Sequence, residues 1–264
     1  MHQDMTKKRI AEFVDELPAH GRYWFSRAEL QHAFDKSDAA ITLALHRLQR
    51  KRRIISPRRG FFVVVPEQYR LIGAPPPVWF IDALMKGWHP DYYVGLLSAA
   101  EIHGAVHHRP QELQVVTDAV LRPIEMSCYR IQFFKKWNVK DVPIMRHKTP
   151  TGHMKVSTPE ATALDLVRYY ESVGYYGKVV TVLSELSENL NGQRLVSAAK
   201  CGIEMAVIQR LGYFLDLIGQ SKLAEPLRKW LSAKGMRVTA LRTDLGVQGS
   251  AINRRWSLQI NEEM

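Results

Sequence analysis

Hydrophobic residues recur at helical spacing near the start of the chain. Residues 6–17 carry Ile10, Phe13, Val14 and Leu17 at i, i+3, i+4 and i+7, which predicts one amphipathic helix. Pro18 and Gly21 then predict its end. A second, shorter helix is expected to begin at Ser26 and to run to about Phe34. Ser26-Arg27-Ala28-Glu29 is a capping-box pattern, in which a serine and a glutamate side chain satisfy free backbone amides.

A third helix and two strands follow. Ser37 is a candidate N-cap, and the helix after it buries one apolar face, made of Ile41, Ala44, Leu45 and Leu48. Residues 54–56 and 61–65 are rich in β-branched and aromatic side chains, and the turn pattern Pro-Arg-Arg-Gly at 57–60 separates them. The order helix, helix, turn, helix and two-stranded wing is that of a winged helix-turn-helix.

The pattern of the remaining residues predicts a second, larger domain. Gly-Ala-Pro-Pro-Pro at 73–77 interrupts regular structure, so we expect a DNA-binding-type domain over 1–70 and another over 78–264. A helix is predicted around 98–102, and strands are predicted at 113–117, 129–134 and 142–145. A second capping box, at 157–160, starts a run of predicted helices over 157–170, 179–190 and 205–218. In the last of these, Gly212 indicates a close contact with another helix. Strands followed by helices indicate the α+β class.

The net charge of the chain limits the classes of partner that it is expected to bind. The chain has 264 residues with 37 Lys and Arg against 26 Asp and Glu, a net charge of +11. Residues 1–68 hold 13 of the basic and 8 of the acidic side chains, so this part is the more basic per residue. Such an excess favours polyanions, either nucleic acid or an anionic membrane surface.

The apolar runs and the cysteines favour an intracellular protein. No apolar run approaches the roughly 20 residues that cross a bilayer, and the first residues lack the apolar core of a signal peptide. Cys128 and Cys201 form no C-x-x-C pattern. We therefore expect two reduced thiols, a cytoplasmic location and no membrane partner.

The third helix is the expected reader of DNA. In a helix-turn-helix this helix enters the major groove. The face opposite its apolar stripe carries Ala39, Thr42, Leu43, His46 and Arg50. Thr42 and His46 can hydrogen-bond base edges, and Leu43 or the Thr42 methyl can contact a thymine methyl. Ser37 is expected to bond a phosphate at the helix N-terminus.

A run of cations follows this helix. Residues 42–59 contain no acid and seven basic side chains, namely Arg47, Arg50, Lys51, Arg52, Arg53, Arg58 and Arg59. Such a stripe suits the neutralisation of phosphates, with Arg58 and Arg59 at the wing tip beside or in the minor groove. The alternatives are a solvated helix end or a winged helix that binds only protein.

The sequence gives less support to a metal site or an active site than to DNA binding. His103, His107 and His108 resemble a metal-binding spacing, but Gly104 and Pro110 interrupt the segment and no second ligand cluster is present. Glu101, Asp118 and Glu125 are the carboxylates that a metal-dependent nuclease or nucleotidyltransferase would use. That enzyme, with the winged helix as its delivery module, is the alternative function. No P-loop, G-x-S-x-G or H-E-x-x-H pattern occurs, so we expect no catalysis, no cofactor and no metal.

Four segments resemble the AbiEi family, the antitoxins of type IV toxin–antitoxin systems. They are residues 93–104, 156–169, 209–213 and 253–258. The resemblance implies a bacterial repressor of its own two-gene operon that binds inverted repeats in double-stranded operator DNA through its N-terminal domain. It also implies a phage-defence antitoxin, acting through its C-terminal domain, that opposes a nucleotidyltransferase-class toxin without needing a stable complex with it. One departure is that Lys51-Arg52-Arg53 stands where such winged helices often have a glycine with positive φ.

Overall fold

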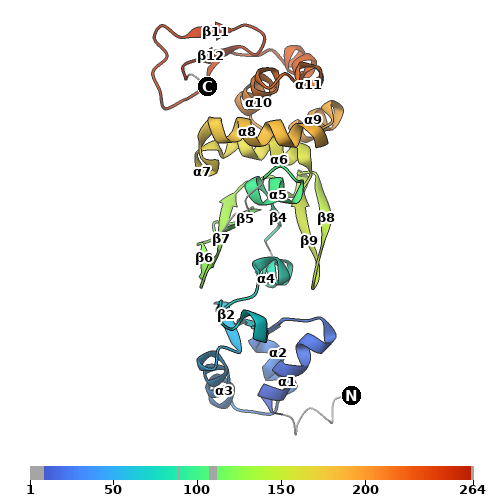
Figure 1. Cartoon of the computed structure of the whole chain (residues 1–264), viewed down its shortest axis with the longest axis vertical. Coiled ribbons are helices and arrows are strands. Elements are labelled where there is room, and N and C mark those ends of the chain that lie inside the picture. The colour runs from blue at the N-terminus through green and yellow to red at the C-terminus, as the bar shows by residue number, and fades with distance from the viewer. Residues whose placement is uncertain (1–8, 89, 107–111, 263–264) are drawn as a thin grey trace.

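The computed structural model describes residues 9–88, 90–106 and 112–262. The molecule is elongated, with the N-terminal domain at one end, a β-sheet in the middle and a layer of helices beyond it (Figure 1). A small C-terminal sheet closes the far end. The predicted α+β class is confirmed.

The N-terminal domain has the element order of a winged helix-turn-helix. Its elements are α1 (Ile10–Glu16), β1 (Trp24–Ser26), α2 (Arg27–Ala33), α3 (Asp38–Arg50), β2 (Ile54–Arg58) and β3 (Phe61–Val64). The three strands form an antiparallel sheet in the order β1-β3-β2. The sequence pattern did not indicate β1, because three residues are too few to show the alternation of a strand.

This small sheet is buried on both faces. Phe25 and Phe62 stack at 5.4 Å between ring centroids and pack with the three helices in one core cluster. Phe61 and Val63 point the other way, into a second cluster shared with Phe80 and the central sheet. The N-terminal domain therefore rests on the second domain through apolar side chains.

The proline-rich segment between the domains is part of this core. Pro76 and Pro77 are buried, and a one-turn 3-10 helix, Pro77–Trp79, follows. The Trp79 ring lies 4.8 Å from Tyr23 and 5.3 Å from Tyr69 between centroids. The segment predicted as the domain boundary thus packs against both sides. The next helix is α4 (Ile81–Trp88).

The central sheet has six strands in the order β6-β7-β5-β4-β9-β8. They are β4 (Tyr92–Val94), β5 (Glu112–Thr117), β6 (Ile124–Met126), β7 (Tyr129–Lys135), β8 (Ile144–Thr149) and β9 (Gly152–Ser157). β5 runs parallel to β7 and β4 parallel to β9, and the other pairs are antiparallel. Side chains alternate between two cores: Tyr92 and Val94 face α4, whereas Tyr93 faces the helical layer.

Helices lie on the other side of the sheet, some in contact with its strands and the others packed on those helices. They are α5 (Leu96–Ile102), α6 (Pro159–Arg168), α7 (Tyr170–Val173), α8 (Tyr175–Leu186), α9 (Gly192–Ala199), α10 (Met205–Leu217) and α11 (Ser221–Lys234). The C-terminal sheet has β10 (Thr239–Ala240), β12 (Leu258–Ile260) and β11 (Ala251–Asn253), in that order. No helix in the described ranges combines the length and apolar character needed to cross a bilayer.

The capping box predicted at 157–160 is wrong in register. The N-cap of α6 is Thr158, whose hydroxyl accepts a hydrogen bond from the Ala161 amide. Ser157 bonds the Thr162 hydroxyl at 2.7 Å instead. Glu160 is buried and accepts from the Asn191 amide at 3.1 Å. Pro159 still occupies the first helical position, where its missing N–H is not needed.

Candidate nucleic-acid interface

Helix α3 presents a fully exposed face. Ser37 caps the helix by accepting from the Ala40 amide at 3.3 Å, and Ile41, Leu45 and Leu48 are buried. The predicted contact residues on the opposite side are all exposed, namely Ala39, Thr42, Leu43, His46 and Arg50, and so is Arg47, the first cation of the predicted basic run. Their accessibility on one helix face is what a reader of the major groove requires.

Two charged residues that sequence reasoning missed organise the start of α3. Asp38 forms an ion pair with Arg27 at 2.8 Å, and Gln31 also donates to it. The hydrogen bonds from Arg27 and then Gln31 hold the pKa of Asp38 below its usual value. No sequence rule pairs residues 27 and 38, because the packing of α2 on α3 brings them together.

This network also occupies the hydroxyl of Thr42. Arg27 donates to the Thr42 oxygen at 2.6 Å, and the hydroxyl donates to the Asp38 carbonyl at 2.8 Å. The methyl group of Thr42 is therefore the part that is free of these bonds. His46, one turn further on, remains exposed.

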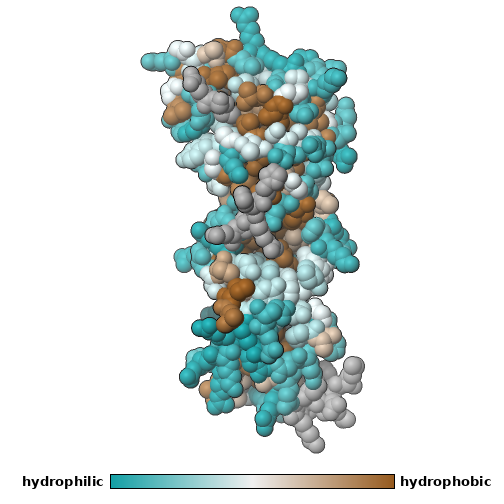
Figure 2. All heavy atoms as spheres, viewed as in Figure 1, coloured by the Kyte–Doolittle hydropathy of each residue, from teal (hydrophilic) through white to brown (hydrophobic). Residues whose placement is uncertain are grey.

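A cationic groove of about 500 Å³ runs between the start of α1 and the flank of α3. Its basic lining consists of Arg9, Lys36, Arg47, Lys51 and Arg53, and it has no acidic lining residue. Arg53 is tied to the Asp15 carboxylate and to the Ala11 carbonyl, so it braces the turn after α3 against α1. Lys36, Arg47 and Lys51 are exposed. Figure 2 shows a predominantly hydrophilic surface over this domain.

The two wing arginines have different surroundings. Arg59 is exposed in the two-residue turn with Gly60, whose φ is +80°. The guanidinium of Arg58 instead lies 4.1 Å from the ring centroid of Trp88 in α4, and burial lowers its pKa. Of the two predicted wing-tip cations, Arg59 is thus exposed, whereas Arg58 stacks on the second domain.

The segment after α3 adopts the left-handed turn that glycine often supplies. Arg52 has a φ of +51°, a conformation that costs an L-residue about 1–2 kcal/mol. The exposed Arg52 side chain keeps the predicted cation at this position. The turn therefore has the expected backbone despite the absence of glycine.

The carboxylates of the enzyme alternative do not meet. Glu101 lies on α5, Asp118 follows β5, and Glu125 on β6 pairs with Arg130 at 3.2 Å. Within the described ranges no group of three or more His, Cys, Asp or Glu side chains could hold a metal ion. His107 and His108 lie outside the described residues. His103 bonds the Ser157 carbonyl at 2.8 Å, and burial lowers its pKa.

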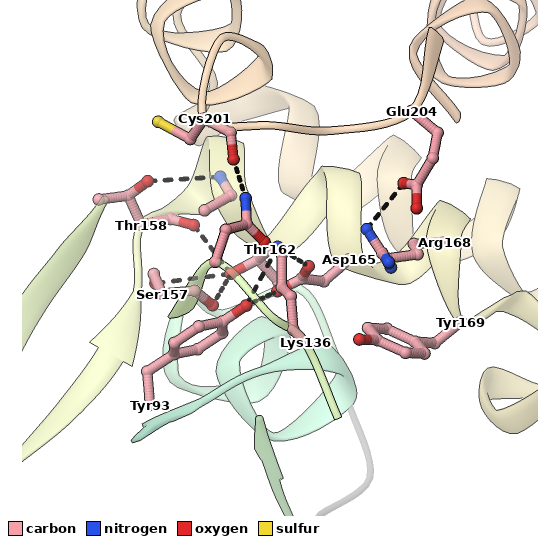
Figure 3. Close-up of polar contacts among 12 residues, drawn as sticks. Tyr93, Lys136, Ser157, Thr158, Thr162, Asp165, Arg168, Tyr169, Cys201 and Glu204 are labelled. Atoms are coloured by element: carbon pink, nitrogen blue, oxygen red, sulfur yellow. Dashed lines mark hydrogen bonds and ion pairs between the residues drawn. The ribbon is translucent and has the colours of Figure 1, made fainter. Parts of the chain in front are cut away.

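A buried polar cluster lies at the junction of the sheet and α6 (Figure 3). The Lys136 ammonium lies 2.8 Å from the Asp165 carboxylate, and both side chains are at most 1% exposed. The Tyr93 hydroxyl donates to the same carboxylate at 2.7 Å. Burial, and then the Asp165 charge, raise the pKa of Tyr93 well above its ordinary value. Because solvent does not reach these groups, they hold the sheet to α6 rather than present a site to a ligand.

The C-terminal motif residues also have structural roles. Gln209 donates to the carbonyls of Trp256 and Arg237, and Arg210 donates to those of Ala240 and Leu241. Gly212 meets the Trp256 ring, because a Cβ atom there would collide with it. The predicted close contact is therefore with an indole and not with a helix.

Comparison with known proteins finds a family match within the second domain. Residues 93–217 match the family model described as the AbiEi antitoxin C-terminal domain. A crystal structure of the RV2827C protein from Mycobacterium tuberculosis aligns with 97% of this chain and 94% of its own, at a TM-score of 0.66 and 17% identity. That likeness shows a shared fold. No curated protein matches the sequence.

A second crystal structure, an antigenic nucleotidyltransferase-like protein from Paracoccidioides brasiliensis, aligns at a TM-score of 0.36 and 9% identity. It covers 57% of this chain and 90% of its own.

Proposed function

We propose that this chain, whose residues 93–217 match the model of the AbiEi antitoxin C-terminal domain, is a DNA-binding repressor of its own operon and the antitoxin of a type IV system. The family match supports an antitoxin role. Its opponent is a toxin of the nucleotidyltransferase class, which it neutralises without needing a stable complex. It acts in the cytoplasm and has no catalytic activity of its own.

The exposed face of α3 beside the cationic groove carries the DNA-binding part of the proposal. α3 enters the major groove of inverted-repeat operator DNA, and His46 hydrogen-bonds a base edge. The Thr42 methyl and Leu43, which is 51% exposed, contact thymine methyl groups. Lys36, Arg47 and Lys51 neutralise phosphates of the strand that follows the groove, because they are exposed and face no acid in its lining.

The wing contributes only one of its two arginines to DNA binding. Arg59 contacts a phosphate or the minor groove, whereas Arg58 stays on Trp88 and fixes the wing. A cation–π contact of this kind contributes about 0.5–2 kcal/mol, and leaving it to reach DNA would forfeit that contribution. Arg59→Ala therefore weakens binding and Arg58→Ala chiefly lowers stability.

Binding to the chain's own upstream DNA tests the proposal. Arg47→Ala with Lys51→Ala removes two phosphate contacts, so the slope of log affinity against log salt should fall by roughly 1.8. The loss should be equal on promoter and random DNA. His46→Ala should lower promoter preference while leaving binding to random DNA unchanged. Lys178→Ala with Lys229→Ala removes the same charge from exposed positions on α8 and α11 and serves as the control.

The proposal fails if the wild-type protein binds no DNA even at low salt, since the winged helix would then be a protein-binding module. An equal loss of DNA affinity in the groove variant and the control variant would mean that binding depends on the net charge of the protein and not on the groove. The antitoxin role is tested by co-expression with the toxin encoded beside it. Growth should be rescued even where the two proteins do not co-purify.

A further inference from the structure

The first residue of α2 holds a side chain on the exposed face of α3. The Arg27 guanidinium donates to the Thr42 hydroxyl at 2.6 Å and lies 2.8 Å from the Asp38 carboxylate. Gln31, one turn further along α2, donates to the same carboxylate at 2.8 Å. A continuous set of polar contacts therefore runs from α2 to the Thr42 side chain.

The backbone of Arg27 is itself fixed in position. Its N–H donates to the Gly60 carbonyl in the wing turn at 2.8 Å. The preceding residue, Ser26, caps α2 by accepting from the Glu29 amide at 3.1 Å. The Arg27 side chain thus starts from an anchored point, and its planar fork of donors can serve the carboxylate and the hydroxyl at the same time.

These bonds select the orientation of the Thr42 side chain. A threonine inside a helix divides between two rotamers, because its hydroxyl can bond a carbonyl of the preceding turn. Here the hydroxyl donates to the Asp38 carbonyl at 2.8 Å and accepts from Arg27 at the same oxygen. Rotation to another staggered position would carry that oxygen away from Arg27. The methyl group of Thr42 therefore keeps one position.

The side chains beside this methyl group are apolar and exposed. Helical spacing makes Ala39 a neighbour of both Thr42 and Leu43. Ala39 is exposed and Leu43 is 51% exposed. Apolar groups on a helix in the major groove contact the C5 methyl of thymine, which no other base of unmodified DNA carries. The patch formed by Ala39, Leu43 and the Thr42 methyl is therefore complementary to a thymine methyl.

We propose that Arg27 determines the base specificity of α3 through Thr42, by engaging its hydroxyl so that the methyl group meets the C5 methyl of a thymine. The inference rests on the proposed DNA binding and names the base chemistry that α3 reads. Arg27 is a positioning residue and needs no contact with DNA. Because the recognised group is a methyl at C5 of a pyrimidine, 5-methylcytosine offers it as well, whereas uracil and cytosine do not.

Upstream DNA duplexes in which single thymines are replaced by uracil test the inference, since the two bases differ only in the C5 methyl. Wild-type protein should bind about fourfold more weakly when the thymine facing Thr42 is replaced. This factor corresponds to about 0.8 kcal/mol for one buried methyl-sized group. At the same position, a duplex with 5-methylcytosine should bind more tightly than one with cytosine by a similar factor.

Variants of Arg27 separate positioning from charge. Arg27→Met should reduce the uracil effect to below twofold, because Thr42 is then free to rotate. Arg27→Lys keeps the charge but lacks the fork, so it should show the same reduction with an unchanged salt slope. Arg22→Met is the matched control. It removes an arginine that pairs with Glu29 of α2, and the fourfold effect should remain.

Two substitutions of Thr42 identify the group that reads the base. Thr42→Ser keeps the hydroxyl and removes the methyl, so the uracil effect should disappear. Thr42→Val replaces the hydroxyl by a second methyl, so the effect should persist. Discrimination by the serine variant and not by the valine variant would overturn the inference, because the hydroxyl would then be the reader.

The uracil effect is a ratio measured on one protein preparation, so a lower folded fraction in a variant does not change it. A fourfold effect that persists in Arg27→Met would overturn the positioning role. Equal losses on thymine and uracil DNA, with a salt slope lower by about 0.9, would make Arg27 a phosphate contact instead.

The wild-type protein separates this inference from the proposed function. Binding to its upstream DNA without an effect of uracil at any position would overturn the methyl contact and leave the proposed function in place. Absence of any binding to duplex DNA at low salt would overturn both.

Discussion

At the scale of single residues, Gly212 is required by packing and not by backbone conformation. Its backbone is helical, but the position has no room for a side chain. It lies inside α10, where glycine costs about 1 kcal/mol relative to alanine. The Trp256 ring covers it, and the indole N–H donates to the Asp216 carboxylate at 2.6 Å. Trp256 is fully buried, so this contact fastens the C-terminal sheet to the helical layer.

Gly212→Ala should therefore destabilise the protein despite its better helix propensity. The added methyl overlaps the Trp256 ring, and overpacking of this kind costs about 1–3 kcal/mol. Chemical denaturation measures the change. Gly177→Ala on α8 is the matched control, because a Cβ there meets nothing within 4 Å. It should be neutral or stabilise by up to about 1 kcal/mol. Equal stability of the two variants would contradict the packing role of Gly212.

At the scale of elements, a single ion pair joins two layers of the fold. Lys136 follows β7 and Asp165 lies on α6, and Tyr93 on β4 shares the carboxylate. A buried ion pair adds little net stability over an apolar pair, but losing one partner leaves a charge buried without compensation. The arrangement therefore fixes where α6 sits on the sheet.

Lys136→Met is expected to cost about 3–5 kcal/mol, because Asp165 is then buried unpaired. Adding Asp165→Asn removes the stranded charge while keeping an acceptor for Tyr93, so the double variant should recover more than half of the loss. Unfolding free energies of the two single variants and the double variant form the cycle. Simple addition of the two single losses would show that the residues act independently.

The elements that could be predicted are those whose pattern is local. The start of α3 and both ends of α10 agree with the sequence prediction to within a residue, because their apolar stripes and the Ser37 cap lie in the sequence itself. α11 was not predicted because Pro226 interrupts it, and β10 to β12 are too short to show alternation. The exposed face of α3 could be predicted for the same local reason. The Arg58–Trp88 stack and the Arg27–Asp38 pair could not, since tertiary packing creates them.

At the scale of the whole molecule, the apolar core continues across the predicted domain boundary. Phe61 on β3 stacks with Trp24 at 5.8 Å and faces Phe80 at 6.5 Å between ring centroids. Val63, on the same strand, is fully buried in the cluster that also holds strands of the central sheet. Separating the domains would expose this face to water at about 25 cal/mol for each Å² of apolar surface. The two domains should therefore unfold together.

Phe34→Ala tests this coupling by destabilising the N-terminal domain alone. Phe34 is 2% exposed and packs wholly within the N-terminal domain, and its truncation should cost about 3–5 kcal/mol. If the shared core couples the domains, the variant lowers amide-exchange protection in β5 of the central sheet as well as in α3, and calorimetry gives one transition at a lower temperature.

Phe80→Ala, within the shared cluster, loosens the coupling and should split the transition in two. Unchanged protection in β5 of the Phe34 variant would mean that the N-terminal domain unfolds by itself, and that its contact with the second domain adds little to its stability.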